Sequence, residues 1–192
     1  MVRDTVMTKP LKSSFLSCEK DLELILEKLF LRSKPHSDML KRLLVVNTKD
    51  CLDALDNKAY NEKLAEMTLP KLKEQGYIQF APKLMFHEHE EVKSSIIIGI
   101  DNFVPTLNPQ FRDCSISFTI ICHNDYWDLG NLRMRPLKIA GYIDGILNNC
   151  KLTGIGTLQF AGCSQLVLDE SLSGYTLIYT ATHGSDDRIE GE

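Results

Sequence analysis

The sequence predicts an α+β fold: a mainly antiparallel sheet of about four to five strands, with a helix packed on one face and a helical region at the N-terminus. Three observations in the C-terminal half lead to this prediction. Residues 115–122 alternate like a strand, residues 136–150 carry a helical stripe, and residues 157–168 and 175–183 alternate on either side of a turn. Changes of hydrophobic period along a chain separate strands from helices, so these segments define a strand, a helix and a β-hairpin.

The strand at 115–122 is predicted from its alternation. Ile116, Phe118, Ile120 and Cys122 fall on one face, and Ser115, Ser117 and Thr119 fall on the other. Successive side chains of a strand point to opposite sides of the sheet. One face of this strand is therefore expected to be buried.

The helix at 136–150 is predicted from its first and last residues and from its stripe. Pro136 stands in the first turn, where the missing N–H has no helical partner to lose. The Asn148-Asn149 pair and Gly154 mark the end. The apolar residues recur at helical spacing, so they can lie together on the sheet: Ile139, Ile143, Ile146, Leu147 and Cys150.

The hairpin at 157–183 is predicted from two amphipathic segments around a turn at residues 169–174. In the first segment, Leu158, Phe160, Leu166 and Leu168 alternate with polar residues. In the second, the apolar face carries Tyr175, Leu177, Tyr179 and Ala181, opposite Thr176, Ile178, Thr180 and Thr182.

The N-terminal region, residues 1–76, is expected to hold an arm and helices. Residues 1–16 are polar, and a helix capped by Ser17 is expected to end before Pro35, which opens a second short helix. Residues 47–76 predict one short helix starting near Thr48 and then irregular or partner-dependent structure, since Pro70 interrupts the pattern. Residues 77–184 are expected to form the sheet core in one domain with these helices, followed by an acidic flexible tail at 185–192.

Two more segments complete the predicted sheet. Residues 77–84 alternate, and Pro82 indicates an edge strand or a strand end. Residues 96–100 are short and rich in isoleucine, which favours a central strand covered on both faces. The stretch 102–112 between the strands contains two prolines and is expected to be an extended connection. It carries apolar residues that need covering, either by the chain's own core or by a neighbouring subunit: Phe103, Val104, Pro105, Leu107 and Phe111.

Composition restricts the functional classes. The 192 residues carry a formal net charge of −4, which argues against a dedicated nucleic-acid binder. No apolar run approaches the roughly 20 residues that a bilayer requires, and no signal-peptide core is present, so synthesis in a cytoplasm and no membrane partner are expected. The six cysteines show no CxxC pairing and are interpreted mainly as small buried hydrophobic residues.

Candidate chemical motifs are incomplete. His87 and His89 could lie on one face of a strand, but no Cys-x-x-Cys or His-Glu-x-x-His partner motif accompanies them. Asp125 and Asp128 flank Trp127 near His123, a combination that also fits an aromatic loop at an interface. The Gly-Ile-Gly run at 154–156 stands after a helix and before a strand, whereas a phosphate loop requires the reverse order. We therefore expect no catalytic residues, no metal, no cofactor and no enzyme activity.

Over the C-terminal 90 or so residues, the order of the predicted elements and the residues in the turns resemble those of the tail-terminator and head–tail joining proteins of tailed bacteriophages. The segments that carry the resemblance are the strand 96–100, the connection 102–112, the strand 116–122, the Arg135-Pro136-Leu137 helix start, the turn 152–156 and the final strand 175–183. The resemblance covers about half of the chain and leaves out the helices before Tyr77.

The resemblance implies a structural protein of the virion neck or tail, assembled in the host cytoplasm as a homo-oligomeric ring. Its expected partners are further copies of itself, adjacent neck, connector and tail proteins, and DNA that passes through a channel without sequence-specific binding. The expected subunit interface comprises the apolar connection residues named above together with Trp127. Two alternatives stay open: a small metal-dependent hydrolase or nuclease using His87, His89, His123, Asp125 and Asp128, and a host partner-binding module.

Overall fold

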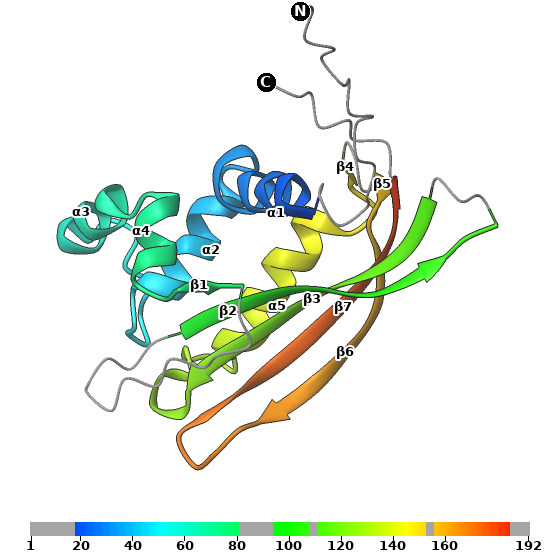
Figure 1. Cartoon of the computed structure of the whole chain (residues 1–192). Helices are drawn as coiled ribbons and strands as arrows, with labels where there is room; N and C mark the ends of the chain where they lie inside the picture. Colours follow the sequence, from blue (N-terminus) through cyan, green and yellow to red (C-terminus); the bar gives the residue numbers. More distant parts are fainter. Residues whose placement is uncertain (1–17, 81–93, 108–110, 153–155, 185–192) are drawn as a thin grey trace, which may run out of the picture.

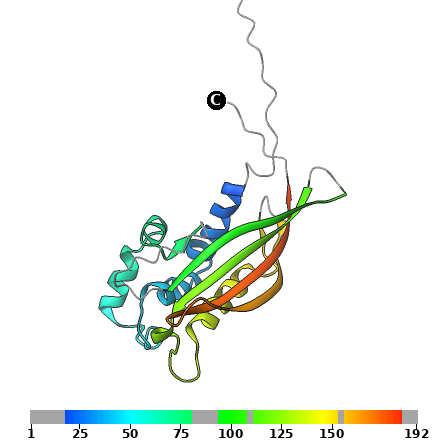
Figure 2. The ribbon, with the colours of Figure 1, turned by 60° about the horizontal axis from the view of Figure 1, so that its bottom comes forward.

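The computed structural model describes residues 18–80, 94–107, 111–152 and 156–184. It confirms the α+β fold: five strands form one mixed sheet in the order β1-β2-β3-β7-β6, and the helices gather on one side of it (Figures 1 and 2). The sheet strands are β1 (Ile78–Gln79), β2 (Ser94–Pro105), β3 (Phe111–His123), β6 (Gln159–Val167) and β7 (Leu172–Gly184). Two short strands, β4 (Lys151–Leu152) and β5 (Gly156–Thr157), form a separate pair. The predicted arm, the His87 and His89 run and the acidic tail lie outside the described residues.

The connection predicted at 102–112 is corrected by the structure. β2 and β3 pair in antiparallel register as far as Val104 with Asp113 and Pro105 with Arg112, so the segment forms the two arms of a long hairpin. A bulge lies between Asp101 and Val104. Pro105 is tolerated because it is the last residue of β2, where a missing donor costs little.

The isoleucine-rich part of β2 is covered fully on one face only. Ile96 and Ile98 are buried against the helices, whereas Ile97 on the opposite face is half-buried. β1 pairs with β2 in parallel and supplies the edge strand predicted near residue 77. The strand at 96–100 is therefore fully covered on one face, not on both faces as predicted.

The predicted central helix is confirmed as α5 (Arg135–Leu147). Pro136 lies in its first turn, and Asn148 and Asn149 follow its end. Its stripe packs on the sheet through buried Ile139, Ile143, Ile146 and Leu147, while Cys150 lies beyond the helix and is half-buried.

The hairpin of β6 and β7 is confirmed, but β6 carries a bulge that the alternation did not predict. Phe160 pairs with Tyr179 and Gly162 with Ile178, so Ala161 is the extra residue. An inserted residue exchanges the two faces of the strand beyond it. Leu166, expected on the face of Phe160, is instead on the other face.

The N-terminal helices are α1 (Cys18–Glu27), a π-helical turn η1 (Lys28–Arg32) and α2 (His36–Val45), as the apolar stripes predicted. The prediction for 47–76 is wrong: residues 49–53 and 55–56 are turns, and two helices follow, α3 (Lys58–Glu66) and α4 (Leu69–Glu74). Asn57 caps α3 by accepting a hydrogen bond from the Tyr60 N–H. Pro70 lies in the first turn of α4 instead of interrupting a helix, since a first-turn proline loses no helical hydrogen bond.

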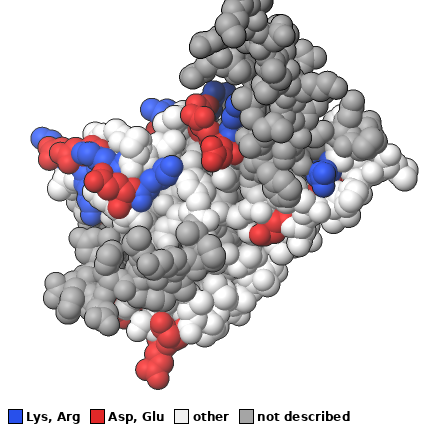
Figure 3. Space-filling model, viewed as in Figure 1, with Lys and Arg blue, Asp and Glu red and all other residues white. Residues whose placement is uncertain are grey.

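One hydrophobic core joins the helical region to the sheet. It contains Leu29 of η1, Leu43 of α2, Phe118 of β3 and Ile143 of α5, all with no exposed surface. The far face of the sheet is different, because β3 and β7 present serine and threonine side chains there. Figure 3 shows a broad surface over the strands with few charged side chains, while lysine, arginine and acidic residues gather over α3 and α4. Within the described residues, no helix has the length and apolar character needed to span a membrane.

Candidate subunit interfaces

The hairpin of β2 and β3 projects past the helices at one end of the sheet (Figures 1 and 2). Its end, called the hairpin tip below, consists of residues 104–107 and Phe111. Its apolar side chains are exposed: Leu107 fully, Val104 by 54% and Phe111 by 42%. A contiguous exposed apolar patch is typical of a binding surface.

Local hydrogen bonds hold the hairpin tip in shape. The Thr106 hydroxyl donates to the Phe111 carbonyl at 3.0 Å. The Thr182 hydroxyl of β7 donates to Asp113 at 2.8 Å and ties the base of the tip to the next strand. A shallow depression of about 650 Å³ lies between these residues and Pro105. The tip therefore presents apolar side chains from a braced hairpin.

The predicted interface residues separate into three places. Val104, Pro105, Leu107 and Phe111 lie on the hairpin tip, where they contact solvent. Phe103 is half-buried and packs against the chain's own core. The remaining residue, Trp127, lies beyond the far end of β3, just after the 3-10 turn η2 (Asn124–Tyr126). The structure does not bring the tip and Trp127 together.

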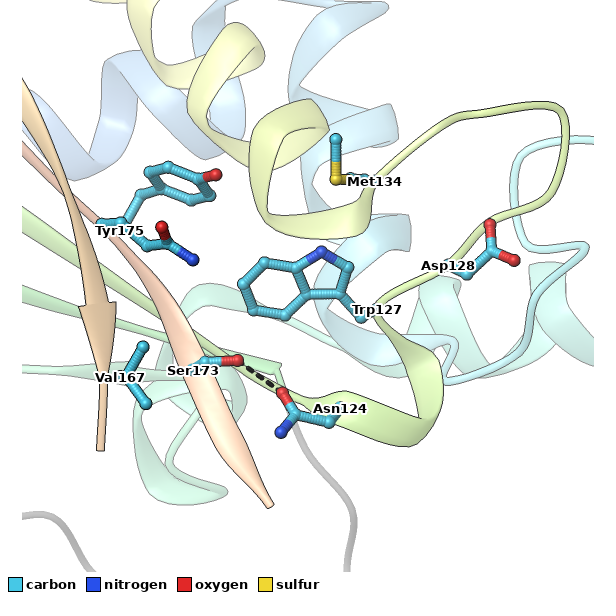
Figure 4. A pocket seen from close by; sticks show the side chains of 8 residues that line it. Asn124, Trp127, Asp128, Met134, Val167, Ser173 and Tyr175 are labelled. Atoms are coloured by element: carbon cyan, nitrogen blue, oxygen red, sulfur yellow. Dashed lines mark hydrogen bonds between the residues drawn. The ribbon is translucent and has the colours of Figure 1, made fainter. Parts of the chain in front are cut away.

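Trp127 forms the floor of a second surface feature, called the Trp127 groove below (Figure 4). The groove is open, has a volume of about 650 Å³ and lies where the ends of β6 and β7 face the loop between β3 and α5. It is lined by Asn124, Trp127, Asp128, Met134, Gln165, Val167, Ser173 and Tyr175. The rings of Trp127 and Tyr175 stand 6.2 Å apart, tilted by 41°.

Arg135 fixes the loop that carries Trp127. The Arg135 N–H donates to the Trp127 carbonyl at 2.7 Å, and its Nε donates to the Tyr126 carbonyl at 2.9 Å. Its Nη1 reaches the end of α2, where it donates to the carbonyls of Leu43 at 2.6 Å and Val46 at 3.0 Å. Arg135 is completely buried. The groove is thus anchored through one side chain to the N-terminal helices.

A second arginine braces the same loop from outside. Arg133 forms a two-pronged ion pair with Asp53, from the turns before α3. Hydrogen bonding from Arg133 holds the pKa of the Asp53 carboxyl below its usual range. Two parallel N–H···O bonds fix orientation as well as distance. The exposed Leu132 therefore stands on a loop that is held at both sides.

Three polar side chains of the groove, Asn124, Asp128 and Ser173, are hydrogen-bonded within the chain. The Ser173 hydroxyl donates to the Asn124 side chain, and the Asp128 carboxylate accepts from the Gly130 N–H at 2.7 Å. Asp128 is the one charged residue among those lining the groove. The chemistry of the walls is otherwise apolar, aromatic or neutral polar.

The acid–base candidates of the sequence do not assemble into a ligand set in the described part of the chain. His123 Nδ1 lies 3.5 Å from the Asp125 carboxylate, and the Asp125 N–H donates to the same nitrogen at 3.2 Å. Asp128 is used in its own turn. Among the described residues no group of three or more His, Cys, Asp or Glu side chains could hold a metal ion.

The cysteines with described side chains are all free thiols. Cys51, Cys114 and Cys122 are buried, as predicted for small hydrophobic residues. Burial raises the pKa of the Cys122 thiol to about 11, so this thiol is protonated at neutral pH. Cys163 differs, since it is exposed on edge strand β6.

Sequence reasoning missed one wall of the groove. Gln165 and Val167 line it because the bulge in β6 places them on the same face as Tyr175. Val167 is 70% exposed, which is unusual for a valine in a strand. The signal in the sequence was Gly162, since a glycine inside a strand pattern often marks a bulge.

These features define an α+β protein with two apolar surfaces at opposite ends of its sheet. The model of the YomW family matches residues 37–181, which includes both the hairpin tip and the groove. The chain belongs to the YomW family, a family of phage-derived proteins from SPbeta-like prophages, and is therefore a phage protein. No curated protein matches the chain.

Proposed function

We propose that this chain is a structural virion protein that forms a ring in a bacteriophage neck or tail, as a tail terminator or head–tail connector. The ring joins tail to head and surrounds the channel through which DNA passes. It is assembled in the host cytoplasm, becomes part of the virion, and has no catalytic activity. Membership of a phage family and the resemblance of residues 96–183 to neck and tail proteins support this proposal.

The observation that carries the proposal is the exposed hairpin tip. Leu107 and Val104 lie on a braced arm that extends away from the core, so no part of the described chain covers them. Each square ångström of apolar surface that is removed from water contributes about 25 cal/mol. A partner that covers the tip gains this free energy, whereas an isolated monomer does not.

The second supporting observation is that the Trp127 groove is a separate and different surface. A closed ring of identical subunits requires heterologous contacts, in which one patch of a subunit meets a different patch of the next. The tip and the groove provide two such patches on one rigid sheet.

Charge is compatible with a DNA channel. The formal net charge of −4 gives the ring an overall acidity that repels phosphates at long range. The broad surface over the strands carries few charged side chains (Figure 3). DNA can slide past such a surface without being held.

The proposal is tested in a phage that carries this gene. We expect deletion of the gene to leave filled heads and tails unjoined, or tails of abnormal length, in electron micrographs of the lysate. Complementation with the natural gene is expected to restore whole particles, and so is complementation with Leu55→Asp, since Leu55 is 51% exposed in the turns before α3 and is not part of the tip. Complementation with Leu107→Asp is expected to fail. Whole infectious particles from the deletion phage would contradict the proposal.

A further inference from the structure

We propose that the hairpin tip of one copy binds in the Trp127 groove of the next copy. This inference rests on the proposed ring and specifies the contact that builds it. Two features of the described residues are its starting point: an apolar projection with Val104, Leu107 and Phe111 exposed, and an open groove with Trp127 and Tyr175 in its lining.

Distance excludes a contact within one chain. The tip joins β3 at Phe111, and the groove begins after β3 ends at His123. A strand rises about 3.3 Å per residue, so these ends stand roughly 40 Å apart. β3 is hydrogen-bonded on both sides, to β2 and to β7, and cannot fold back on itself. A tip that fills a groove must therefore come from another copy.

The two surfaces match in chemistry. The tip residues named above include no charged side chain, and its exposed groups are Val104, Leu107 and Phe111. The groove offers Trp127 as its aromatic floor, Tyr175 as an aromatic wall, and the flexible side chain of Met134, which is 41% exposed. Aromatic residues and methionine are enriched at protein interfaces, and charged residues are depleted at their centres. The one carboxylate, Asp128, is exposed and can remain in water at the rim.

The groove edge also offers hydrogen-bonding groups to an incoming hairpin. Within the described sheet β6 is an edge strand, so one side of its backbone has no strand partner among the described residues. No charged residue occurs between Thr157 and Leu168, although natural edge strands commonly use charges to prevent pairing. An arm of the hairpin can therefore lie along β6 while the tip fills the groove.

Such a contact is heterologous and repeats from copy to copy. If the rotation between copies closes, the product is a ring, and if it does not, the product is a filament. A stable protein–protein contact buries about 800 Å² of accessible surface on each partner, so the arms of the hairpin must be covered together with the tip. The edge of β6 supplies the additional surface.

Site-directed cross-linking tests the contact directly. Two single variants are made in a chain in which the exposed Cys163 is replaced by Ser: Leu107→Cys on the tip and Val167→Cys in the groove. Mixed and treated with a short bis-maleimide, they are expected to give a covalent heterodimer. The control mixture pairs Leu107→Cys with Leu55→Cys, which is expected to give at least tenfold less product. Equal yields in the two mixtures would overturn the inference.

Assembly of charged variants separates this inference from the proposed function. Leu107→Asp and Val167→Asp are each expected to raise the concentration needed for ring formation at least tenfold. Both side chains are exposed in the monomer, so circular dichroism is expected to show an unchanged fold. If both variants form rings as the unaltered chain does, the tip–groove contact is wrong but the ring proposal stands. If the unaltered chain forms no ring under any condition, the proposed function is wrong.

Discussion

Replacing Arg135 with Met is expected to destabilise the fold severely, because its buried guanidinium serves four backbone carbonyls. It donates to Leu43 at 2.6 Å, Val46 at 3.0 Å, Thr48 at 2.6 Å and Tyr126 at 2.9 Å. The first two belong to the C-terminal end of α2, where carbonyls have no helical partner and where a cation is favoured. Each hydrogen bond contributes about 1 kcal/mol net, so the four together contribute about 4 kcal/mol.

The substitution Arg135→Met keeps most of the side-chain volume, so the loss reports mainly the hydrogen bonds. A loss of about 4 kcal/mol is a large part of the roughly 5–15 kcal/mol that stabilises a domain. Urea or guanidinium denaturation measures it, and in a chain of this size the melting temperature is expected to fall by about 8–16 °C. The matched control is Lys138→Met, an exposed residue of the same helix, which is expected to change the free energy of unfolding by less than about 0.5 kcal/mol. A loss below about 1 kcal/mol for Arg135→Met would refute this reasoning.

Two further predictions concern the β7 backbone and the outer brace of the groove loop. Gly174→Ala is expected to lower the free energy of unfolding by at least about 3 kcal/mol, because the added Cβ would overlap the Ile120 carbonyl of β3. The control Gly162→Ala, whose added Cβ has nothing within 4 Å, is expected to lower it little. Similar denaturation midpoints for the two variants would contradict this. The Asp53 carboxyl has a pKa below its ordinary value of 3.8, so its ion pair with Arg133 stabilises the folded state at neutral pH and is lost as pH falls through the lowered pKa. An NMR titration of Asp53 is expected to show the lowered pKa and Arg133→Gln to restore the ordinary value; an unchanged pKa in Arg133→Gln would exclude this pair as the cause.

The sequence predicted correctly those elements in which the spacing of the apolar residues indicates one buried face. The alternation through Phe118 and the stripe through Ile143 needed no knowledge of neighbours, because burial on one side fixes both patterns. Two predictions based on prolines were wrong. Pro70 lies in the first turn of α4 and Pro105 ends β2, two positions where proline is tolerated, yet both were interpreted as breaking regular structure.

The candidate site could be predicted only in part. The apolar residues of the hairpin tip could be identified in the sequence, because Leu107 and its neighbours lack the spacing of a strand or helix that packs on a core. The groove could not be identified, since Trp127 and Val167 are 40 residues apart in sequence and line one groove only because the β6 bulge sets the register. Arg135 could be seen only as a helix-start residue, because its acceptors belong to the distant end of α2 and to adjoining loops.

The central claim is that this phage protein assembles with itself into a ring, and the mass of the purified chain tests it most directly. Native mass spectrometry would be recorded with and without the other neck and tail proteins of the same phage. We expect a single closed multiple of the 21.8 kDa chain, formed by the chain alone or on addition of those proteins. A chain that remains a monomer in both samples would contradict the account.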